Sequence, residues 1–174
     1  MSEDLSYPIG KFKPIEVTAE LREQFIQTIS ELPKQLRDAC SGLSEEQLET
    51  QYRPEGWTVK QVVHHVADSH ANSLIRFKLA LTEDTPQIKP YMEDKWAELA
   101  DSKHAPAELS LNQIDSIHAR WVLVLNAMSS DDFDRNLFHP EHGKVSLNYM
   151  LSLYAWHCQH HLAHITELKK RNNW

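Results

Sequence analysis

The chain has 174 residues, which is enough for a single domain that buries roughly 70% of the surface exposed by its unfolded chain. Its 18 basic and 25 acidic residues give a formal net charge of -7, which disfavours binding to nucleic acid and to anionic membrane surfaces. The sequence shows neither a signal sequence at its start nor a run of about 18 apolar residues, so we expect one cytoplasmic domain over residues 1–174 without a membrane segment.

Four long segments show helical periodicity, and together they contain one of the eight prolines and none of the four glycines. No alternating pattern of apolar and polar residues is long enough to predict a strand. The periodicity and the placement of proline and glycine therefore predict an all-α fold with four main helices.

The first part of the chain is predicted to be an arm followed by a helix. Residues 1–17 contain Pro8 and Pro14, which favour an extended N-terminal arm. Thr18 is a suitable N-cap, and apolar residues recur at helical spacing from there to about Cys40. This helix supplies core residues and no candidate chemistry.

The second helix is predicted to begin after Thr58, which has the capping-box spacing, and to run to about Leu81. A polar stripe follows one edge of its buried face. The residues of this stripe are of types that ligate, hydrogen-bond and bind anions: His65, Ser69, Asn72 and Arg76. We take His65 as a candidate metal ligand and Arg76 and Asn72 as candidates for binding a substrate.

Two residues of this helix keep alternative interpretations. Arg76 is suited to a substrate carboxylate or phosphate, but an ordinary surface role agrees equally well with its position. Asp68 is a candidate for orienting a ligand or acting as a base. A single carboxylate is weak evidence for such a role, and an exposed helix acid is the simpler interpretation.

Residues 82–105 form a long connection with at most one short helix near its middle. The third helix is predicted from about Ala107 to Met128, and His118 on its apolar side is expected to be a hydrogen-bonded core residue. Two turns then contain His139 and His142, which we interpret as loop histidines.

The fourth helix, from about Leu147 to Arg171, carries four of the eleven histidines within residues 156–164. His160 and His164 are one helical turn apart, so their imidazoles can converge on one point. Neutral imidazole is a common ligand for zinc and also suits nickel, copper and iron. Paired histidines on a helix are often only solvated, so a third ligand is needed to favour a metal site.

His65 can be that third ligand only if the second and fourth helices are antiparallel, because it lies near the start of one helix and His164 near the end of the other. An up-down-down-up four-helix bundle meets this condition. It requires a crossover between the second and third helices of about 36 Å, at 1.5 Å rise per residue. The long connection over residues 82–105 fits this requirement, so ligand geometry and loop length predict the same topology.

Residues 56–70 and 156–165, together with residues 5–10 and 73–79, resemble the DinB/YfiT-like superfamily, and the likeness covers nearly the whole chain. The resemblance implies a four-helix bundle with one divalent ion, zinc or nickel, per chain. It also implies a homodimer, and some members of the superfamily transfer low-molecular-weight thiols such as bacillithiol or mycothiol. The ligands that the resemblance implies are those expected from the spacing: His65, His160 and His164.

Three functions remain open from the sequence. Three neutral imidazoles leave an ion with an open position, so the chain is expected to be a metal-dependent hydrolase acting on a small molecule. The same site could activate a thiol for transfer to an electrophile, as in a bacillithiol S-transferase. The third alternative is a non-catalytic protein with a structural ion, which needs a fourth ligand. Cys158 is the only thiol near the cluster, and it lies on a different side of the helix from His160.

Overall fold

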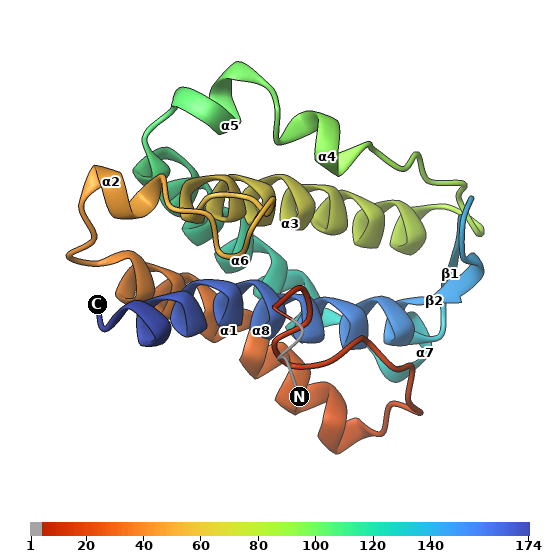
Figure 1. The fold of residues 1–174 in the computed structure, drawn as a ribbon. Helices are drawn as coiled ribbons and strands as arrows, with labels where there is room; N and C mark the ends of the chain where they lie inside the picture. The colour runs from red at the N-terminus through yellow and green to blue at the C-terminus, as the bar shows by residue number, and fades with distance from the viewer. Residues whose placement is uncertain (1–4) are drawn as a thin grey trace.

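The computed structural model describes residues 5–174, and four long helices form most of it (Figure 1). Their bounds lie close to the predicted ones: α1 Ala19–Cys40, α3 Val59–Thr82, α6 Ala107–Ala127 and α8 Leu147–Asn172. Three of them begin at the predicted N-caps, where the side chains of Thr18, Thr58 and Ser146 accept hydrogen bonds from backbone N–H groups of the first turn. The predicted four-helix bundle is therefore confirmed.

Helices α1 and α8 are neighbours that run in the same direction. Near their starts, Nε of Arg22 donates to Oδ1 of Asn148 at 3.3 Å. Near their ends, Nζ of Lys169 donates to the carbonyl oxygen of Ala39 at 2.7 Å. Contacts therefore advance along both helices together, which defines a parallel pair.

Helices α3 and α8 run in opposite directions. The rings of His65 and His161 have centroids 4.7 Å apart, and four residues later in α3 the hydroxyl of Tyr154 donates to the carbonyl oxygen of Ser69 at 3.2 Å. Residues later in α3 therefore contact residues earlier in α8. The antiparallel arrangement on which the choice of His65 depended is present.

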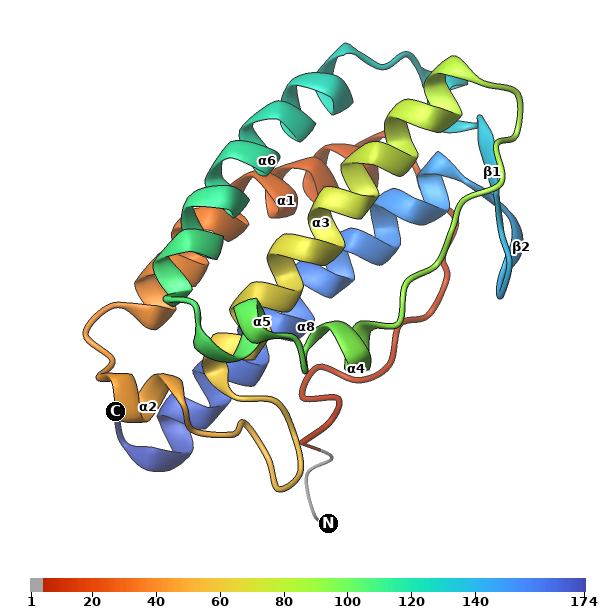
Figure 2. The ribbon, with the colours of Figure 1, turned by 90° about the horizontal axis from the view of Figure 1, so that it is seen from above.

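Helix α6 runs in the direction of α3, which completes the topology. Nδ1 of His64 lies 2.7 Å from the hydroxyl of Ser110, and further along both helices Nδ1 of His70 lies 2.7 Å from Nε2 of His118. The four helices are therefore up, down, down and up in chain order, as predicted. The view from above shows α3 lying alongside α6 and α8 (Figure 2).

The connection from α3 to α6 runs along the outside of the bundle, above α3 in Figure 1. It contains two short helices, α4 Glu93–Trp96 and α5 Ala100–His104, where the sequence predicted at most one. The side-chain amide of Gln61 donates to the carbonyl oxygen of Ala97 at 2.8 Å, which fastens the connection to α3. This position places Glu93 beside the histidines of the bundle.

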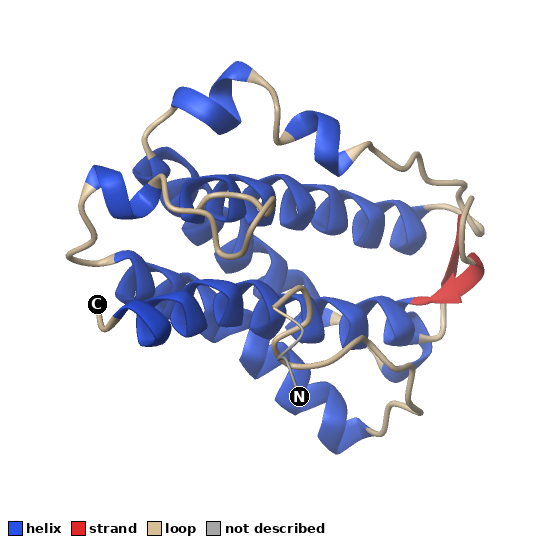
Figure 3. Cartoon of the chain, in the orientation of Figure 1, coloured by secondary structure: helices blue, strands red, loops and turns tan. Residues whose placement is uncertain are grey.

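A small antiparallel hairpin, β1 Asn136–His139 paired with β2 Gly143–Ser146, was not predicted (Figure 3). Each strand has four residues, which is too short for an alternating pattern to stand out from turn residues. Gly143 adopts φ of +72°, which a glycine accepts without strain in the turn. His139 therefore ends a strand and is buried, whereas the sequence suggested a loop histidine.

Two short helices, α2 Glu45–Leu48 and α7 Ser130–Phe133, complete the secondary structure of residues 5–174. Within this part of the chain, no helix has both the length and the apolar composition required to span a bilayer.

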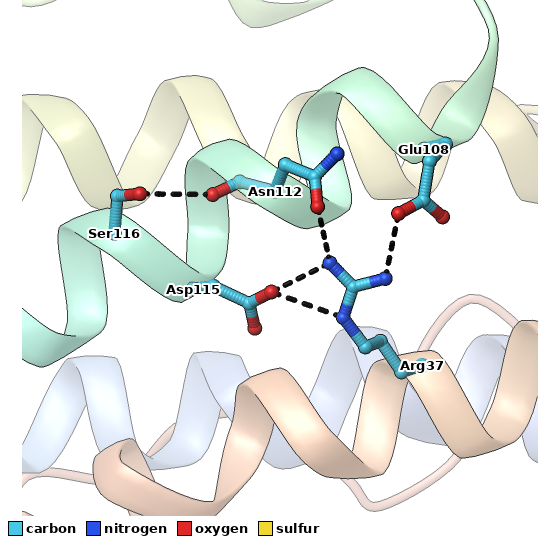
Figure 4. A network of polar contacts seen from close by, with 5 residues as sticks. All are labelled: Arg37, Glu108, Asn112, Asp115 and Ser116. Carbon is cyan, nitrogen blue, oxygen red and sulfur yellow. Dashed lines mark hydrogen bonds and ion pairs between the residues drawn. The ribbon is translucent and has the colours of Figure 1, made fainter.

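One polar cluster links α1 to α6 at the bundle surface (Figure 4). The guanidinium of Arg37 forms ion pairs with Glu108 at 2.8 Å and with Asp115 at 2.5 Å, and it donates to Oδ1 of Asn112. Surface ion pairs contribute little individually, so the buried apolar faces of the helices supply most of the stability. Trp121, Phe77, Ile114 and Leu151 are among the fully buried side chains of this core.

Candidate metal centre

Five histidines line a cavity of about 430 Å³ between α3, α8 and the loop before α3. One comes from α3 and four from α8: His65, His157, His160, His161 and His164. At about 100° per residue, the four positions in α8 fall within one arc of the helix surface. The cluster therefore follows from the spacing of the histidines and from the antiparallel packing of α3 on α8.

The three predicted ligands are all buried, with exposed fractions of 5% for His65, 7% for His160 and 3% for His164. Ligand nitrogens of His160, His161 and His164 lie within 4.8 Å of one another. Those of His65, His157 and His161 form a second such group. The structure thus brings His160 and His164 together as predicted and places His65 in the adjoining group.

His161 belongs to both groups, and the sequence reasoning did not consider it. The signal that could have found it is its position four residues after His157 and three before His164. It faces the same cavity as the predicted ligands.

Burial keeps the predicted ligands neutral. Desolvation, together with the neighbouring histidines, lowers the pKa of His65 to about 3 and that of His164 to about 4. Desolvation alone lowers the pKa of His160 to about 4. Neutral imidazole has a lone pair on one ring nitrogen, and this is the form that binds a metal ion.

Three buried ring nitrogens facing this region have no hydrogen-bond partner among residues 5–174: Nδ1 of His160, of His161 and of His164. Buried polar atoms in native proteins are nearly always satisfied, so such a group needs an explanation. A divalent cation would satisfy several of these lone pairs at once. The donor set and its protonation state therefore fit a divalent metal ion.

Aromatic side chains and the N-terminal arm hold the rings in place. Tyr52 stacks on His164 with ring centroids 3.9 Å apart, and Trp156 stacks on His160 at 4.4 Å. Nε2 of His164 donates a hydrogen bond to the carbonyl oxygen of Ser6 at 3.3 Å, which leaves the lone pair of Nδ1 available to bind a metal ion. Hydrogen bonds of this kind orient a metal-binding histidine. The arm, described from residue 5, thus packs on the site.

A chain of histidines reaches the site from the core. Nδ1 of His118 lies 2.6 Å from the carbonyl oxygen of Ile29, and its Nε2 lies 2.7 Å from Nδ1 of His70. Nε2 of His70 lies 2.9 Å from Nδ1 of His157, whose Nε2 lies 3.3 Å from Nε2 of His65. His118 is thus the hydrogen-bonded core histidine that the sequence predicted.

Three carboxylates line the histidine cavity, those of Glu55, Glu93 and Asp94, and Glu93 approaches a histidine of the cluster. Its Oε2 lies 4.0 Å from Nε2 of His65, and its side chain, 57% exposed, lines the cavity. Partial desolvation, with the charges of Asp94 and Glu141, raises the pKa of Glu93. Sequence reasoning missed Glu93 because it lies in a connection whose course over α3 is set by tertiary packing.

Asp68, the carboxylate chosen from the sequence, lies elsewhere. It is absent from the lining of the histidine cavity, and burial together with Asp101 raises its pKa to about 6. Its neighbour in the chosen set, Asn72, donates its amide to the carbonyl oxygen of Asp68 at 2.9 Å, a bond within α3. Asp68 and Asn72 therefore do not line the histidine cavity.

A second cavity, of about 560 Å³, adjoins the first. Glu93, Asp94 and His157 line both, so these side chains form a shared wall. Arg76, which was chosen together with Asn72 for binding a substrate, lines the second cavity together with His139 of the hairpin. The predicted stripe along α3 therefore leads from the histidine cluster to a neighbouring hollow.

Known proteins resemble this chain over most or all of its length. The sequence profile of the DinB superfamily matches residues 18–165, which include the four long helices almost entirely. A protein of Bacillus cereus strain B4264, named "Putative metal-dependent hydrolase", is 54% identical over 174 residues, covering 98% of this chain and 99% of the relative. A protein of the same name from Bacillus mycoides strain KBAB4 is 52% identical over 173 residues, covering 99% of each chain.

A solved structure has the same fold. YfiT from Bacillus subtilis, described as a probable metal-dependent hydrolase with an unusual four-helix bundle topology, superimposes with a TM-score of 0.95. It is 47% identical in sequence, and the match covers 98% of this chain and 99% of YfiT.

Proposed function

The chain belongs to the DinB superfamily, and on this premise we propose that it is a metal-dependent hydrolase of a small molecule, with one divalent ion, zinc or nickel, held by His65, His160 and His164. The observation that carries the proposal is the set of three buried imidazole nitrogens without a hydrogen-bond partner among residues 5–174, on histidines that line the cavity. The names of the relatives agree with this chemistry.

The three proposed ligands come from two helices. His160 and His164 come from successive turns of α8 and supply two nitrogens from one rigid element. His65 supplies the third from α3, so binding of an ion would also tie the antiparallel helices together. Stacking of Tyr52 and Trp156 on the two α8 rings reduces their freedom to rotate, which lowers the entropic cost of binding.

A divalent ion in this site would supply Lewis-acid chemistry, acidifying a water molecule and polarising a carbonyl or phosphoryl oxygen. The carboxylate of Glu93 would act as the proton acceptor at this site, because its Oε2 lies 4.0 Å from Nε2 of His65 and its side chain lines the cavity. Trp57 and Tyr52 line the same cavity. Glu93 replaces Asp68 as the proposed base.

A structural ion is the weaker alternative. A closed tetrahedral site needs a fourth protein ligand, and thiolate is a common one. Cys158 is fully buried, burial raises the pKa of its thiol, and it is not among the residues that line the histidine cavity. His161 would then have to be the fourth ligand, since its ligand nitrogen lies within 4.8 Å of those of His160 and His164, whereas the cavity beside the histidines leaves room for a substrate.

The experiment compares protein stripped with a chelator and protein reloaded with zinc or nickel. Ester and amide substrates test hydrolysis, and an electrophile with bacillithiol tests thiol transfer. We expect hydrolysis that appears on reloading and disappears on stripping. Metal-dependent consumption of the thiol without hydrolysis would instead identify a transferase, and equal activity in both samples would contradict a metal-dependent enzyme.

A further inference from the structure

Arg76 is a buried cation without an anionic partner. Its side chain is 8% exposed, and it lines the second cavity. Among residues 5–174, no carboxylate lies within 4.0 Å of its guanidinium. Its one hydrogen bond to these residues is donated to the carbonyl oxygen of Lys89 at 3.4 Å. The guanidinium has five N–H donors, so most of its capacity faces the cavity unused.

Another arginine of the same chain shows what a structural role requires. Arg37 has two carboxylates and an amide oxygen around its guanidinium. Arg76 is more buried than Arg37 and has neither kind of partner. Burying an unpaired charge is strongly unfavourable, so an anion bound in the cavity would stabilise the guanidinium of Arg76.

We propose that Arg76 forms an anion-binding subsite, which receives a carboxylate or phosphate group of the substrate while the reacting group lies at the histidine cluster. Guanidinium matches both anions through two parallel N–H donors. This inference rests on the proposed hydrolase for its reacting end, and on the buried unpaired guanidinium for its anionic end.

The geometry sets the length of the substrate. Arg76 follows His65 by 11 positions in α3, which is about 16 Å along the axis at 1.5 Å per residue. The two cavities share a wall, so one extended molecule can occupy both. We therefore expect an elongated organic anion whose charged end and reacting group are separated by roughly 10 to 16 Å, allowing for the reach of the arginine side chain.

The other residues that line the second cavity fit a substrate with its anionic end at Arg76 and its reacting end at the histidine cluster. Tyr91, Leu153 and Tyr154 supply apolar walls for the body of the molecule. The acidic side chains Glu93 and Asp94 belong to the wall shared with the histidine cavity, so they lie toward the reacting end. The remaining acidic residue, Glu141, is exposed on the hairpin.

The test measures binding of inorganic phosphate and of succinate by calorimetry at low ionic strength, with wild type, Arg76→Met and the matched variant Lys95→Met. Lys95 lines the same cavity but is exposed, so its loss should change the dissociation constants by less than about twofold. Arg76→Met should weaken binding about tenfold or more, while Arg76→Lys should restore part of it. The two anions separate a phosphate-selective subsite from a carboxylate-selective one.

Stability and metal dependence separate the outcomes. Arg76→Met should be at least as stable as wild type, because it removes a buried unpaired charge without removing volume. Binding must also persist in chelator-stripped protein. Anion binding that vanishes with the metal and ignores Arg76, absence of saturable binding, or marked destabilisation of Arg76→Met would each overturn the inference while leaving the hydrolase intact. Anion binding through Arg76 without hydrolysis would retain the subsite and remove the hydrolase.

Discussion

Nε2 of His70 lies 2.9 Å from Nδ1 of His157, at the centre of a hydrogen-bonded chain that starts at the Ile29 carbonyl oxygen. Burial lowers the pKa of His118 to about 4 and those of His70 and His157 well below the ordinary value, so all three are neutral. A carbonyl only accepts, so Nδ1 carries the proton in each ring in turn. The chain thus fixes the tautomer of His157 and leaves its Nε2 lone pair toward His65.

The first prediction is that His157→Ala retains the metal ion. His157 is held by His70 on one side and acts on His65 on the other, so its loss should disturb orientation and leave the ligands in place. Elemental analysis should find close to one ion per chain in this variant. His160→Ala and His164→Ala should instead contain almost none. Equal loss of metal from His157→Ala would move the site to the group formed by His65, His157 and His161.

The second prediction is that His65→Ala folds normally but has no turnover. His65 is one residue at the edge of a core that is supplied by four helices, so circular dichroism should be unchanged. Two imidazoles from α8 should still hold some metal weakly. Kinetics should show activity no higher than that of stripped wild-type protein. An unfolded variant, or one with normal turnover, would argue that the ion is structural or that His65 is not a ligand.

The third prediction concerns Glu93. Glu93→Gln should lower kcat by about 10² to 10⁴, the usual range for loss of a general base, with metal content unchanged. Asp94→Asn is the matched control, because Asp94 lines the same two cavities but its carboxylate does not come within 4.0 Å of the ring nitrogens of His65. Its kcat should change by less than about threefold. A similar loss in both variants would indicate a general effect of negative charge on the site.

The fourth prediction is that metal-free protein loses stability on acidification from about pH 6.5 to about pH 4. His65 and His118 have pKa values of about 3 and 4 when folded, against an ordinary 6.5, so below pH 6.5 the unfolded chain binds more protons. Each such histidine should lower the free energy of unfolding by up to about 1.4 kcal/mol per pH unit. Asp68, whose pKa is raised to about 6 from 3.8, has the opposite sign and offsets part of the loss.

Urea denaturation at a series of pH values would measure this slope. His118→Phe should make the slope shallower by about one proton. A stability that is flat between pH 6.5 and pH 4 would contradict the burial of neutral histidines.

The helices could be predicted from the sequence because their signals are local. Thr18, Thr58 and Ser146 mark helix starts through their own hydrogen bonds, and the periodicity of apolar residues gives the lengths. The topology followed from two constraints: ligands near the start of one helix and near the end of another can meet only in an antiparallel pair, and the connection over residues 82–105 is long enough for a crossover. The hairpin was missed because four-residue strands leave no distinct pattern.

The site could be predicted only in part. Positions on one helix face, such as His160 and His164, follow from spacing alone. Glu93 could not be found, because its place depends on how the crossover packs over α3. Asp68 and Asn72 shared the helix with His65 and Arg76, but the structure gives them no contact with either cavity. Periodicity predicts which residues share one face of a helix. The packing of neighbouring helices then determines which of these residues line a cavity.

The most direct measurement is an anomalous diffraction map at the absorption edge of zinc or nickel, from crystals of the reloaded protein. The account predicts one strong peak per chain, about 2.0 to 2.1 Å from one ring nitrogen each of His65, His160 and His164 if the metal is zinc. A peak bound by His157 in place of His160 and His164, a peak only at His139 and His142 on the hairpin, or no peak would contradict it.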